Sequence, residues 1–209
     1  MKPPPPFDAD PVPRPWGLGV NAKPDPIQQT TGIKKGCIDM LKLFVNTWGN
    51  YNENGADGGQ WINLPMEEDD LLETLERIAE SIGDRDPEWA IHDYEWTDID
   101  FGKVSEYDSI IPLNDTLTRL SDLESYEQEE VAAAIEAFGY SLEEAMDRQE
   151  RGCFALYHGM DLEEVAEELV NDCCDLPEFA LRYFDFAAFA RDLGFDGYTE
   201  TAFGVILDA

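Results

Sequence analysis

The sequence predicts an α+β protein, built as an elongated chain of two or three small modules. Short runs rich in β-branched and aromatic residues occur near both ends of the chain's body, and helical patterns with capping signals fill the middle. We therefore expect a proline-rich flexible leader over residues 1–40, an N-terminal module of antiparallel sheet plus helix over 41–108, a helical module over 109–150, and a C-terminal module of sheet plus helices over 151–209.

The first module is expected to begin with a β-hairpin. Residues 41–48 and 60–64 have the composition of strands, and the Asn- and Gly-rich segment 49–59 between them is predicted to be a turn. Residues 66–82 place their leucines and isoleucines on one helical face, and a glycine follows directly. Residues 89–96 alternate between apolar and polar side chains, which predicts a third strand.

Capping residues predict three helices in the middle of the chain. Asn114 is expected to cap a helix over 115–123, and Ser125 is expected to cap one over 126–138. Ser141 begins a capping-box pattern and predicts a short third helix.

The last module is predicted to start with a strand at 153–158. Asp161 with Glu164 forms the capping-box pattern of a further helix. An aromatic-rich segment, 178–193, is expected to be one long helix, and 197–207 is expected to form a terminal hairpin.

Charge is the most unusual property of the sequence. The 209 residues include 46 acidic and 14 basic side chains, for a formal net charge of -32. Residues 1–42 have a net charge of +2 and hold nine of the 13 prolines, so residues 43–209 have a net charge of -34. This excludes an ordinary nucleic-acid binder, which needs a basic surface, and a binder of anionic membranes. A hydrophobic content of 43% excludes a disordered acidic tail.

Metal and catalytic sites find little support. Asn50, Asn52, Asn54 and Gly55 approach the spacing of a calcium loop, but Trp61 stands where the loop needs a bidentate Glu. The two histidines and four cysteines lack zinc-site spacing, and no nucleophile elbow, phosphate-binding loop or dinucleotide fingerprint occurs. We expect no enzyme, no metal and no cofactor.

Location is predicted from what the sequence lacks. No apolar run is long enough for a membrane helix, and four prolines follow Lys2 where a signal peptide would be apolar. The cysteines do not form a disulfide framework, which favours reduced thiols. We expect a cytoplasmic protein that binds neither membrane nor nucleic acid.

The scale of the negative charge suggests a partner. A net charge of about 2–8 keeps a small domain soluble. Duplex DNA carries one charge per ~1.7 Å, so a body of net charge -34 matches about 58 Å of duplex. Such a protein could enter a positively charged DNA-binding cleft. The alternatives are a solvated acidic surface and an acidic adaptor or chaperone that shields basic DNA-binding proteins.

Four segments of the sequence, taken in order, resemble the ArdA family of antirestriction proteins. They are an opening hairpin, a strand with an Asp-Tyr-Glu element, an aromatic helix and a last hairpin. The resemblance covers about residues 43–209 and omits the proline-rich leader. The residues that carry it are 44–52 with 58–64, 90–95, 183–193 and 197–206.

This resemblance implies a non-enzymatic DNA mimic, carried by plasmids or conjugative transposons and acting in the cytoplasm of a bacterial host. It implies inhibition of type I restriction–modification enzymes by filling the DNA groove of their specificity and methyltransferase subunits. It also implies a curved homodimer that pairs through the C-terminal module.

The expected DNA-mimic surface consists of outward-facing acids along the middle of the chain. These are Glu67, Glu68, Asp69, Asp70, Glu73, Glu76, Glu80, Asp115, Asp122, Glu124, Glu127, Glu129, Glu130, Glu143, Glu144, Glu163, Glu164, Glu167 and Glu168. A candidate dimer seam, with burial in the core as the alternative, consists of Tyr183, Phe184, Phe186 and Phe189.

Overall fold

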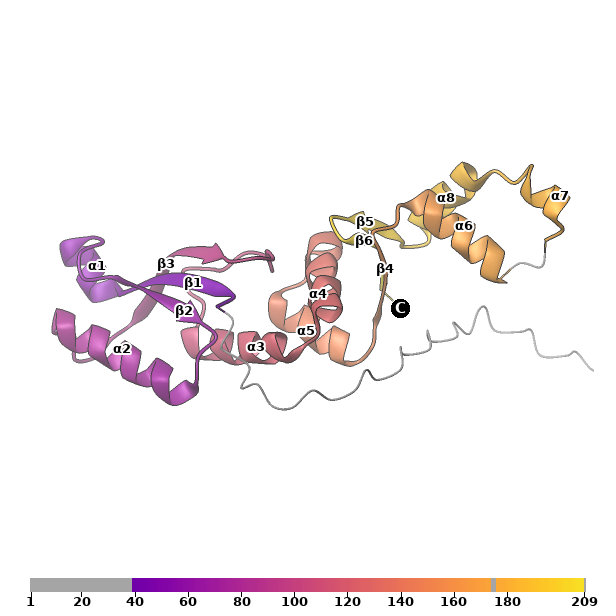
Figure 1. The fold of residues 1–209 in the computed structure, drawn as a ribbon. Helices are drawn as coiled ribbons and strands as arrows, with labels where there is room; N and C mark the ends of the chain where they lie inside the picture. Colours follow the sequence, from indigo (N-terminus) through magenta and orange to yellow (C-terminus); the bar gives the residue numbers. More distant parts are fainter. Residues whose placement is uncertain (1–38, 174–175, 209) are drawn as a thin grey trace, which may run out of the picture. The chain divides into compact units, whose positions relative to one another are not determined.

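The structure is a computed structural model that describes residues 39–173 and 176–208. The predicted leader lies outside the described residues, except for its last two positions. The α+β prediction is confirmed, because the described residues form helices together with two three-stranded antiparallel sheets (Figure 1). No helix in this part of the chain is both long enough and apolar enough to cross a bilayer.

The first sheet has β1 (Leu41–Thr47) as its middle strand. β2 (Gln60–Leu64) and β3 (Trp89–Trp96) pair with it on either side, both antiparallel, so the predicted hairpin and third strand are confirmed. Alternate residues of β1 are buried, and the register pairs Leu43 with Ile62. One face of the sheet is therefore apolar and the opposite face is free to carry polar side chains.

The predicted turn between the first two strands is wrong in part, because it begins with a helix, α1 (Trp48–Asn54). The Thr47 hydroxyl accepts a hydrogen bond from the backbone N–H of Asn50 at 3.2 Å and caps this helix. The buried side chain of Asn46 accepts from the Asn50 amide at 3.0 Å and donates to the carbonyl of Gly55 at 3.2 Å. Asn50, one of the asparagines that suggested a turn, thus lies in a short helix and binds Asn46 near the end of β1.

The predicted first-module helix is confirmed as α2 (Glu68–Ile82). Leu71, Leu75 and Ile78 are buried on its inner face. Gly83 ends the helix with φ of 74°, a left-handed conformation that favours glycine.

The predicted cap at Asn114 is wrong, because α3 (Ile110–Asp122) begins a full turn earlier, after Ser109. Asn114 is only 2% exposed and lies inside the helix. Its side-chain amide donates to the carbonyl of Met66 and its carbonyl accepts from the Met66 N–H, each at 2.9 Å. A polar residue that resembled a helix cap instead joins α3 to the segment that precedes α2.

The next two helices lie close to their predicted positions. α4 (Ser125–Phe138) begins at Ser125, so the residue at the cap position is Glu124 and not Ser125. α5 (Leu142–Glu150) has the predicted cap, since the Ser141 hydroxyl accepts from the N–H of Glu144 at 3.2 Å.

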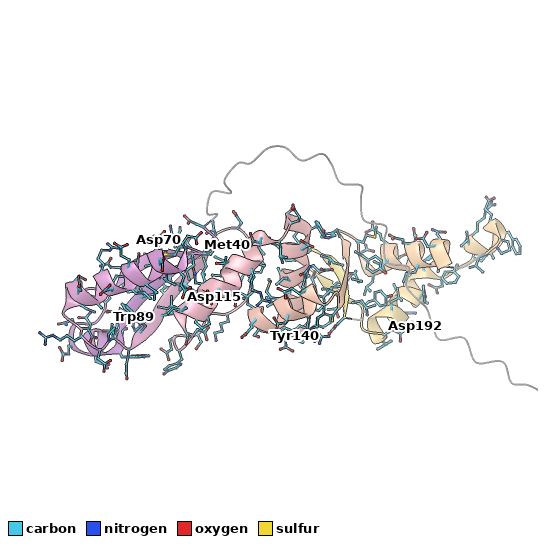
Figure 2. All side chains as sticks on the ribbon, turned by 90° about the horizontal axis from the view of Figure 1, so that it is seen from below. Met40, Asp70, Trp89, Asp115, Tyr140 and Asp192 are labelled. Carbon is cyan, nitrogen blue, oxygen red and sulfur yellow. The ribbon has the colours of Figure 1, made fainter. Side chains whose placement is uncertain are left out.

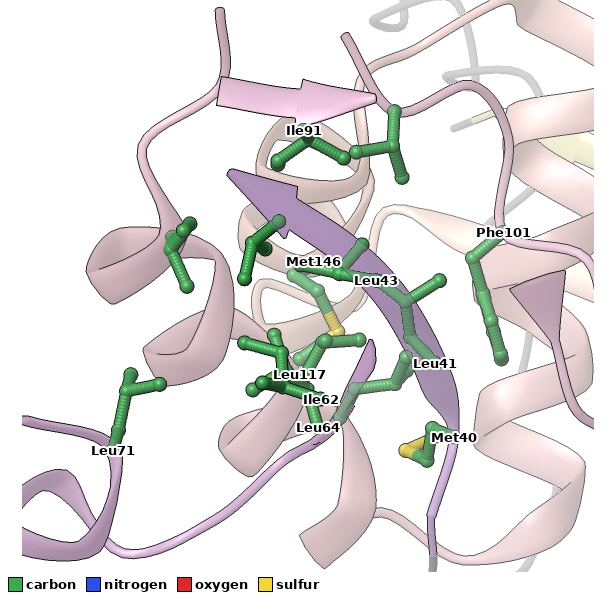
Figure 3. Close-up of a cluster of buried hydrophobic side chains, with 14 of the residues drawn as sticks. Met40, Leu41, Leu43, Ile62, Leu64, Leu71, Ile91, Phe101, Leu117 and Met146 are labelled. Carbon is green, nitrogen blue, oxygen red and sulfur yellow. The ribbon is translucent and has the colours of Figure 1, made fainter. Parts of the chain in front are cut away.

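One hydrophobic core joins the first sheet to the helices that follow it (Figure 3). Leu41, Leu43 and Leu64 from the sheet meet Leu117 of α3 and Met146 of α5, and all five are fully buried. Residues on both sides of position 108, the predicted boundary of the first module, therefore contribute to the same core.

The second sheet has the order β4-β6-β5. β6 (Gly204–Asp208) lies between β4 (Phe154–His158) and β5 (Thr199–Thr201), which confirms the predicted strand and terminal hairpin. The Arg148 guanidinium of α5 forms an ion pair with Asp208 at the end of β6. The Tyr140 hydroxyl donates to the same carboxylate at 2.5 Å, so this sheet is joined to the helices before it.

The predicted long aromatic helix is wrong, because it is broken into α7 (Glu178–Leu181) and α8 (Phe186–Phe195). The Asp185 side chain accepts a hydrogen bond from the N–H of Ala188 at 2.9 Å and caps a new helix in the middle of the segment. The second of these helices extends past the predicted end at residue 193, because Gly194 lies within α8.

The preceding helix, α6 (Leu162–Cys173), has the predicted capping box. Asp161 and Glu164 each bind the other's backbone N–H through a side-chain oxygen, at distances of 2.9 and 3.0 Å. Its buried face packs against α8 through Val165 and Ala190.

Candidate functional site: the acidic helix faces

The acids of α2 form the clearest candidate surface. Asp69, Glu73, Glu76 and Glu80 recur at the spacing of one helical face, and all four are exposed. At a rise of 1.5 Å per residue this row is about 16 Å long. Glu67, Glu68 and Asp70 are exposed around its start, so all seven predicted residues of this segment lie at the surface. Asp70 is labelled in Figure 2.

The α2 row is electrostatically costly. Acids in the first turn interact favourably with the helix dipole, but Glu76 and Glu80 lie toward the opposite end, where the dipole disfavours them. No basic residue occupies the last turn, and the pair Glu76–Glu80 repels at i,i+4 spacing. Among the ion pairs of the described residues, none includes a carboxylate of α2. These charges therefore remain available to a partner.

α6 resembles α2 in this respect. Glu163 and Glu167 are exposed, Glu168 is half-buried, and the last turn again lacks a basic residue. Glu164 is exposed but its carboxylate is bound to the N–H of Asp161. One of the four predicted residues on this helix thus has a structural role as well.

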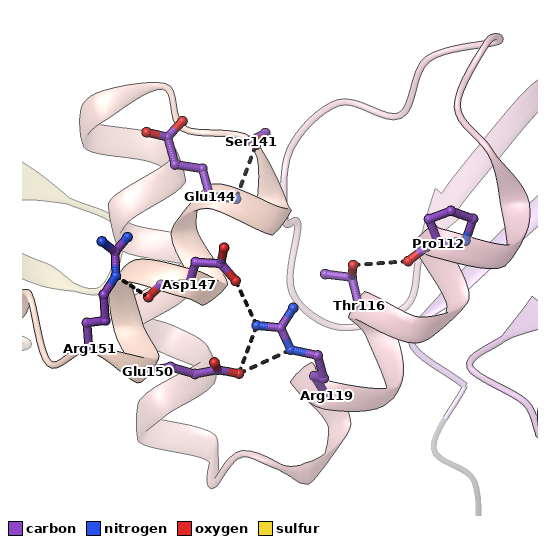
Figure 4. Close-up of polar contacts among 8 residues, drawn as sticks. All are labelled: Pro112, Thr116, Arg119, Ser141, Glu144, Asp147, Glu150 and Arg151. Carbon is purple, nitrogen blue, oxygen red and sulfur yellow. Dashed lines mark hydrogen bonds and ion pairs between the residues drawn. The ribbon is translucent and has the colours of Figure 1, made fainter.

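On α3 and α5, some acids form ion pairs and others do not. The Arg119 guanidinium contacts Asp147 at 2.9 Å and Glu150 at 2.8 Å (Figure 4). Neither acid was among the predicted surface residues. The predicted acids of this region are exposed and have no ion pair within the described part of the chain; they are Asp115, Asp122, Glu143 and Glu144.

The acids of α4 are less available than the sequence predicted. Glu124 is exposed, but Glu127, Glu129 and Glu130 are half-buried. The Glu127 carboxylate accepts from the N–H of Glu124 at 2.9 Å, and Glu129 lies 3.1 Å from the His158 ring nitrogen. Burial raises the pKa of Glu130 to about 7, against a smaller lowering by the hydrogen bond from Gln149, so its charge is partly lost near neutral pH.

The four aromatic residues of the candidate dimer seam have different environments. Phe186 and Phe189 pack against the core formed with α6. The Phe184 ring lies 4.9 Å from that of Phe186 and 5.9 Å from that of Phe189. Tyr183, by contrast, is 88% exposed.

Sequence reasoning missed acids on the outer face of the first sheet. Asp93 and Glu95 are exposed on β3, where alternation places them opposite the buried side. Lys42 on the neighbouring strand contacts Glu95 at 3.3 Å, which leaves Asp93 without an ion pair in the described region. The signal was present in the alternating pattern of the strand.

A groove of about 650 Å³ lies near these helices. Trp96, Phe101 and Tyr140 line it, together with the carboxylates Asp108 and Glu143. Among the described residues, no group of three or more His, Cys, Asp or Glu side chains is placed to hold a metal ion.

Exposed carboxylates thus lie on α2, α3, α5 and α6, whereas the predicted acids within α4 are half-buried. A family model described as antirestriction protein (ArdA) matches residues 43–206. The chain belongs to the ArdA family. ArdA proteins are antirestriction proteins, which act as inhibitors of restriction–modification systems and not as enzymes. Comparison with curated proteins gives no match.

For an ArdA protein, the relevant chemistry of these faces is non-covalent. Carboxylates accept hydrogen bonds from Lys and Arg and form charge-assisted contacts with them. Those cations are also the groups that proteins use to hold DNA phosphates. An exposed carboxylate face of this kind can therefore bind a basic protein surface.

Proposed function

We propose that this ArdA protein inhibits type I restriction–modification enzymes as a DNA mimic. Its exposed carboxylates replace DNA phosphates against the Lys and Arg side chains of the DNA groove that the specificity and methyltransferase subunits form. The protein acts in the cytoplasm of a bacterial host, where such enzymes meet incoming DNA.

The observation that carries this proposal is the row on α2. Its four acids belong to a segment, 67–80, that holds seven acids and one base, Arg77, over about 20 Å, for a net of roughly one negative charge per 3 Å of helix axis. Duplex DNA carries one per ~1.7 Å, so a single helix reaches more than half the linear charge density of DNA. Because the row lacks ion pairs within the described chain, binding does not first require an internal salt bridge to break.

The proposal includes a homodimer formed by the C-terminal module, 151–209. Support comes from aromatic side chains that remain exposed there, with Tyr183 at 88% and Phe179 at 69%. Exposed aromatic side chains are typical of surfaces that bind another protein. Replacing Tyr183 with Lys is expected to shift the protein from dimer to monomer in sedimentation equilibrium, whereas an unchanged mass would remove Tyr183 from the seam.

Competition provides the direct test of the mechanism. A labelled duplex is bound to a type I methyltransferase core, made of specificity and methyltransferase subunits, and the full-length protein is added at low salt. Displacement of the duplex at a stoichiometric ratio is the expected result. If excess protein leaves the duplex bound, DNA mimicry at this enzyme is wrong.

The same preparation tests the alternative of an acidic adaptor. A histone-like basic protein is titrated with the ArdA protein under identical conditions. DNA mimicry predicts tighter binding to the methyltransferase core than to the histone-like protein. The opposite order would favour the adaptor.

A further inference from the structure

An aromatic row lies beside the first sheet, outside the predicted acidic surface. It consists of Tyr51 and Trp48 from α1, His92 from β3 and Tyr107 from the segment after β3. The rings of Tyr51 and His92 stack with centroids 3.9 Å apart, Trp48 meets His92 edge-on at 5.6 Å, and Trp48 stacks on Tyr107 at 5.7 Å.

The end of the row is open to solvent. Tyr107 is 73% exposed although one face of its ring is stacked on Trp48, so the other face is free. Tyr51 at the opposite end is 39% exposed. A large aromatic ring held in place by a second ring, with its outer face in water, is typical of a binding surface and not of a core.

One carboxylate, that of Glu106, lies beside the exposed ring. Glu106 hydrogen-bonds with the Tyr107 hydroxyl, which raises the pKa of that tyrosine. Asp84 lies beside Gly49 of α1, the residue that follows Trp48. Neither acid takes part in an ion pair within the described part of the chain.

The aromatic row itself carries no positive charge near neutral pH that would repel a cation. Burial lowers the pKa of His92, against a smaller raising effect of Glu106, and its Nε2 is buried without a hydrogen-bond partner in the structure. A neutral imidazole leaves the ring faces of the row electron-rich. The combination of an open ring face with an adjacent free carboxylate is complementary to a planar cation.

We propose that Tyr107 and Glu106 form a docking site for an arginine side chain of the protein partner. The guanidinium stacks on the free face of Tyr107 and forms an ion pair with Glu106. Arginine fits better than lysine, because its planar group can stack and pair at once, whereas an ammonium is a compact, strongly hydrated charge. This inference rests on the proposed function for the partner's identity, since a DNA-binding groove supplies arginines.

Short peptides test the site without the restriction enzyme. Fluorescein-labelled hexa-arginine and hexa-lysine are titrated against the full chain and followed by anisotropy. An exposed cation–π contact contributes about 0.5–1 kcal/mol, which corresponds to about a two- to five-fold change in affinity. Tyr107→Leu is therefore expected to reduce the ratio of hexa-arginine to hexa-lysine affinity by about two- to five-fold, while Tyr107→Phe keeps it.

Tyr126 provides a matched control. It is 56% exposed and lies beside Glu127, but it does not belong to the row. Tyr126→Leu is expected to leave the arginine preference unchanged. Glu106→Gln is expected to weaken both peptides. An unchanged ratio in Tyr107→Leu, or an equal fall in Tyr126→Leu, would overturn the site.

The restriction enzyme then separates the two proposals. Tyr107→Leu is expected to inhibit about two- to five-fold less well than the wild type in the duplex-displacement assay. If the wild type displaces DNA while Tyr107→Leu matches it and keeps the peptide preference, the arginine site is wrong and DNA mimicry stands. If the wild type fails to displace DNA, the DNA-mimic proposal is wrong. The ratio of hexa-arginine to hexa-lysine affinity then shows by itself whether the arginine site exists.

Discussion

Asn114 illustrates how one buried polar residue can fix the position of an acidic helix. It satisfies both backbone groups of Met66, two residues before α2 begins, from a site that is 2% exposed. Removing its amide leaves an N–H and a carbonyl unpaired, and an unpaired buried polar group costs more than the hydrogen bond itself contributes.

Asn114→Ala is therefore expected to lower the free energy of unfolding by about 2–3 kcal/mol. Urea denaturation followed by circular dichroism measures this change. Asn63→Ala is the control, because Asn63 is exposed and, within the part of the chain that the structure describes, its side chain binds the exposed Asp39. It is expected to cost about 0.5 kcal/mol or less. Equal losses in the two variants would contradict the role given to Asn114.

Glu130 shows that an acid on a predicted surface can act against stability. Its pKa is about 7 in the folded protein, above the ordinary carboxyl value of 4.5. The folded state therefore binds more protons than the unfolded chain between these values, and stability falls as pH rises from about 4.5 through 7.

Glu130→Gln removes this titration. At about pH 8 the variant is expected to be more stable than the wild type by about 1 kcal/mol, a value reduced because part of the side chain remains in water. At about pH 4 the two proteins should have the same stability, because both carry a neutral side chain there. Thermal unfolding across this range provides the measurement. A wild-type advantage at high pH would show that the Glu130 charge is well solvated.

At the scale of elements, a variant of the α2 row tests whether inhibition depends on where the negative charges lie or only on how many there are. The variant Asp69→Asn, Glu73→Gln, Glu76→Gln, Glu80→Gln removes four charges that lack partners. We expect duplex displacement to weaken by at least ten-fold, since each phosphate-like contact contributes to a collective interaction. We also expect the variant to unfold at an equal or higher temperature, because like charges at i,i+4 no longer repel.

The matched control neutralises four acids that already have a cationic partner, namely Glu95, Asp147, Glu150 and Glu178. It changes the net charge by the same amount. The control is expected to retain most of the displacement activity and to lose some stability. If both quadruple variants lose activity equally, net charge and not the α2 row determines inhibition.

Some helices and strands could be predicted from the sequence and others could not. Strands β1–β3 and the helices α2 and α5 were predictable, because apolar periodicity and local caps agree with the packing that buries them. Three of the errors arose where an Asn or Asp could serve two roles. Asn114 resembled a cap and bridges two segments, Asn46 organises a helix in place of a turn, and Asp185 divides one predicted helix into two.

The candidate surface was predictable to a similar extent. A helical repeat identifies which acids of α2 face outward, and the structure exposes all seven. The sequence could not show that Glu130 is half-buried or that Glu129 lies beside His158, since both depend on elements distant along the chain. The aromatic row was missed for the same reason, because its four rings come from three separate segments.

At the scale of the whole molecule, salt distinguishes a protein mimic from the DNA it replaces. Both bind through charge, so both affinities fall as salt rises. The acids of α2 are spaced more widely than DNA phosphates, however, so fewer counterions accompany them and fewer are released on binding. The affinity of the enzyme for the protein is therefore expected to fall less steeply with salt than its affinity for duplex.

This prediction is checked by measuring both dissociation constants over a salt series and comparing the slopes of the log–log plots. The protein is expected to become the better competitor as salt rises. A steeper slope for the protein than for the duplex would contradict it, and would indicate that more ion pairs form with the protein than with DNA.

The central place of β6 in the second sheet also bears on how the chain is made. Both β4 and β5 pair with β6, so neither strand can form its sheet hydrogen bonds until Gly204–Asp208 has left the ribosome. The first sheet, by contrast, has all its strands once Trp96 is synthesised, and its covering helices are complete at Glu150. We infer an order of maturation in which the acidic helix beside the first sheet takes shape while the ribosome is still translating, and the module bearing the exposed tyrosine is finished last.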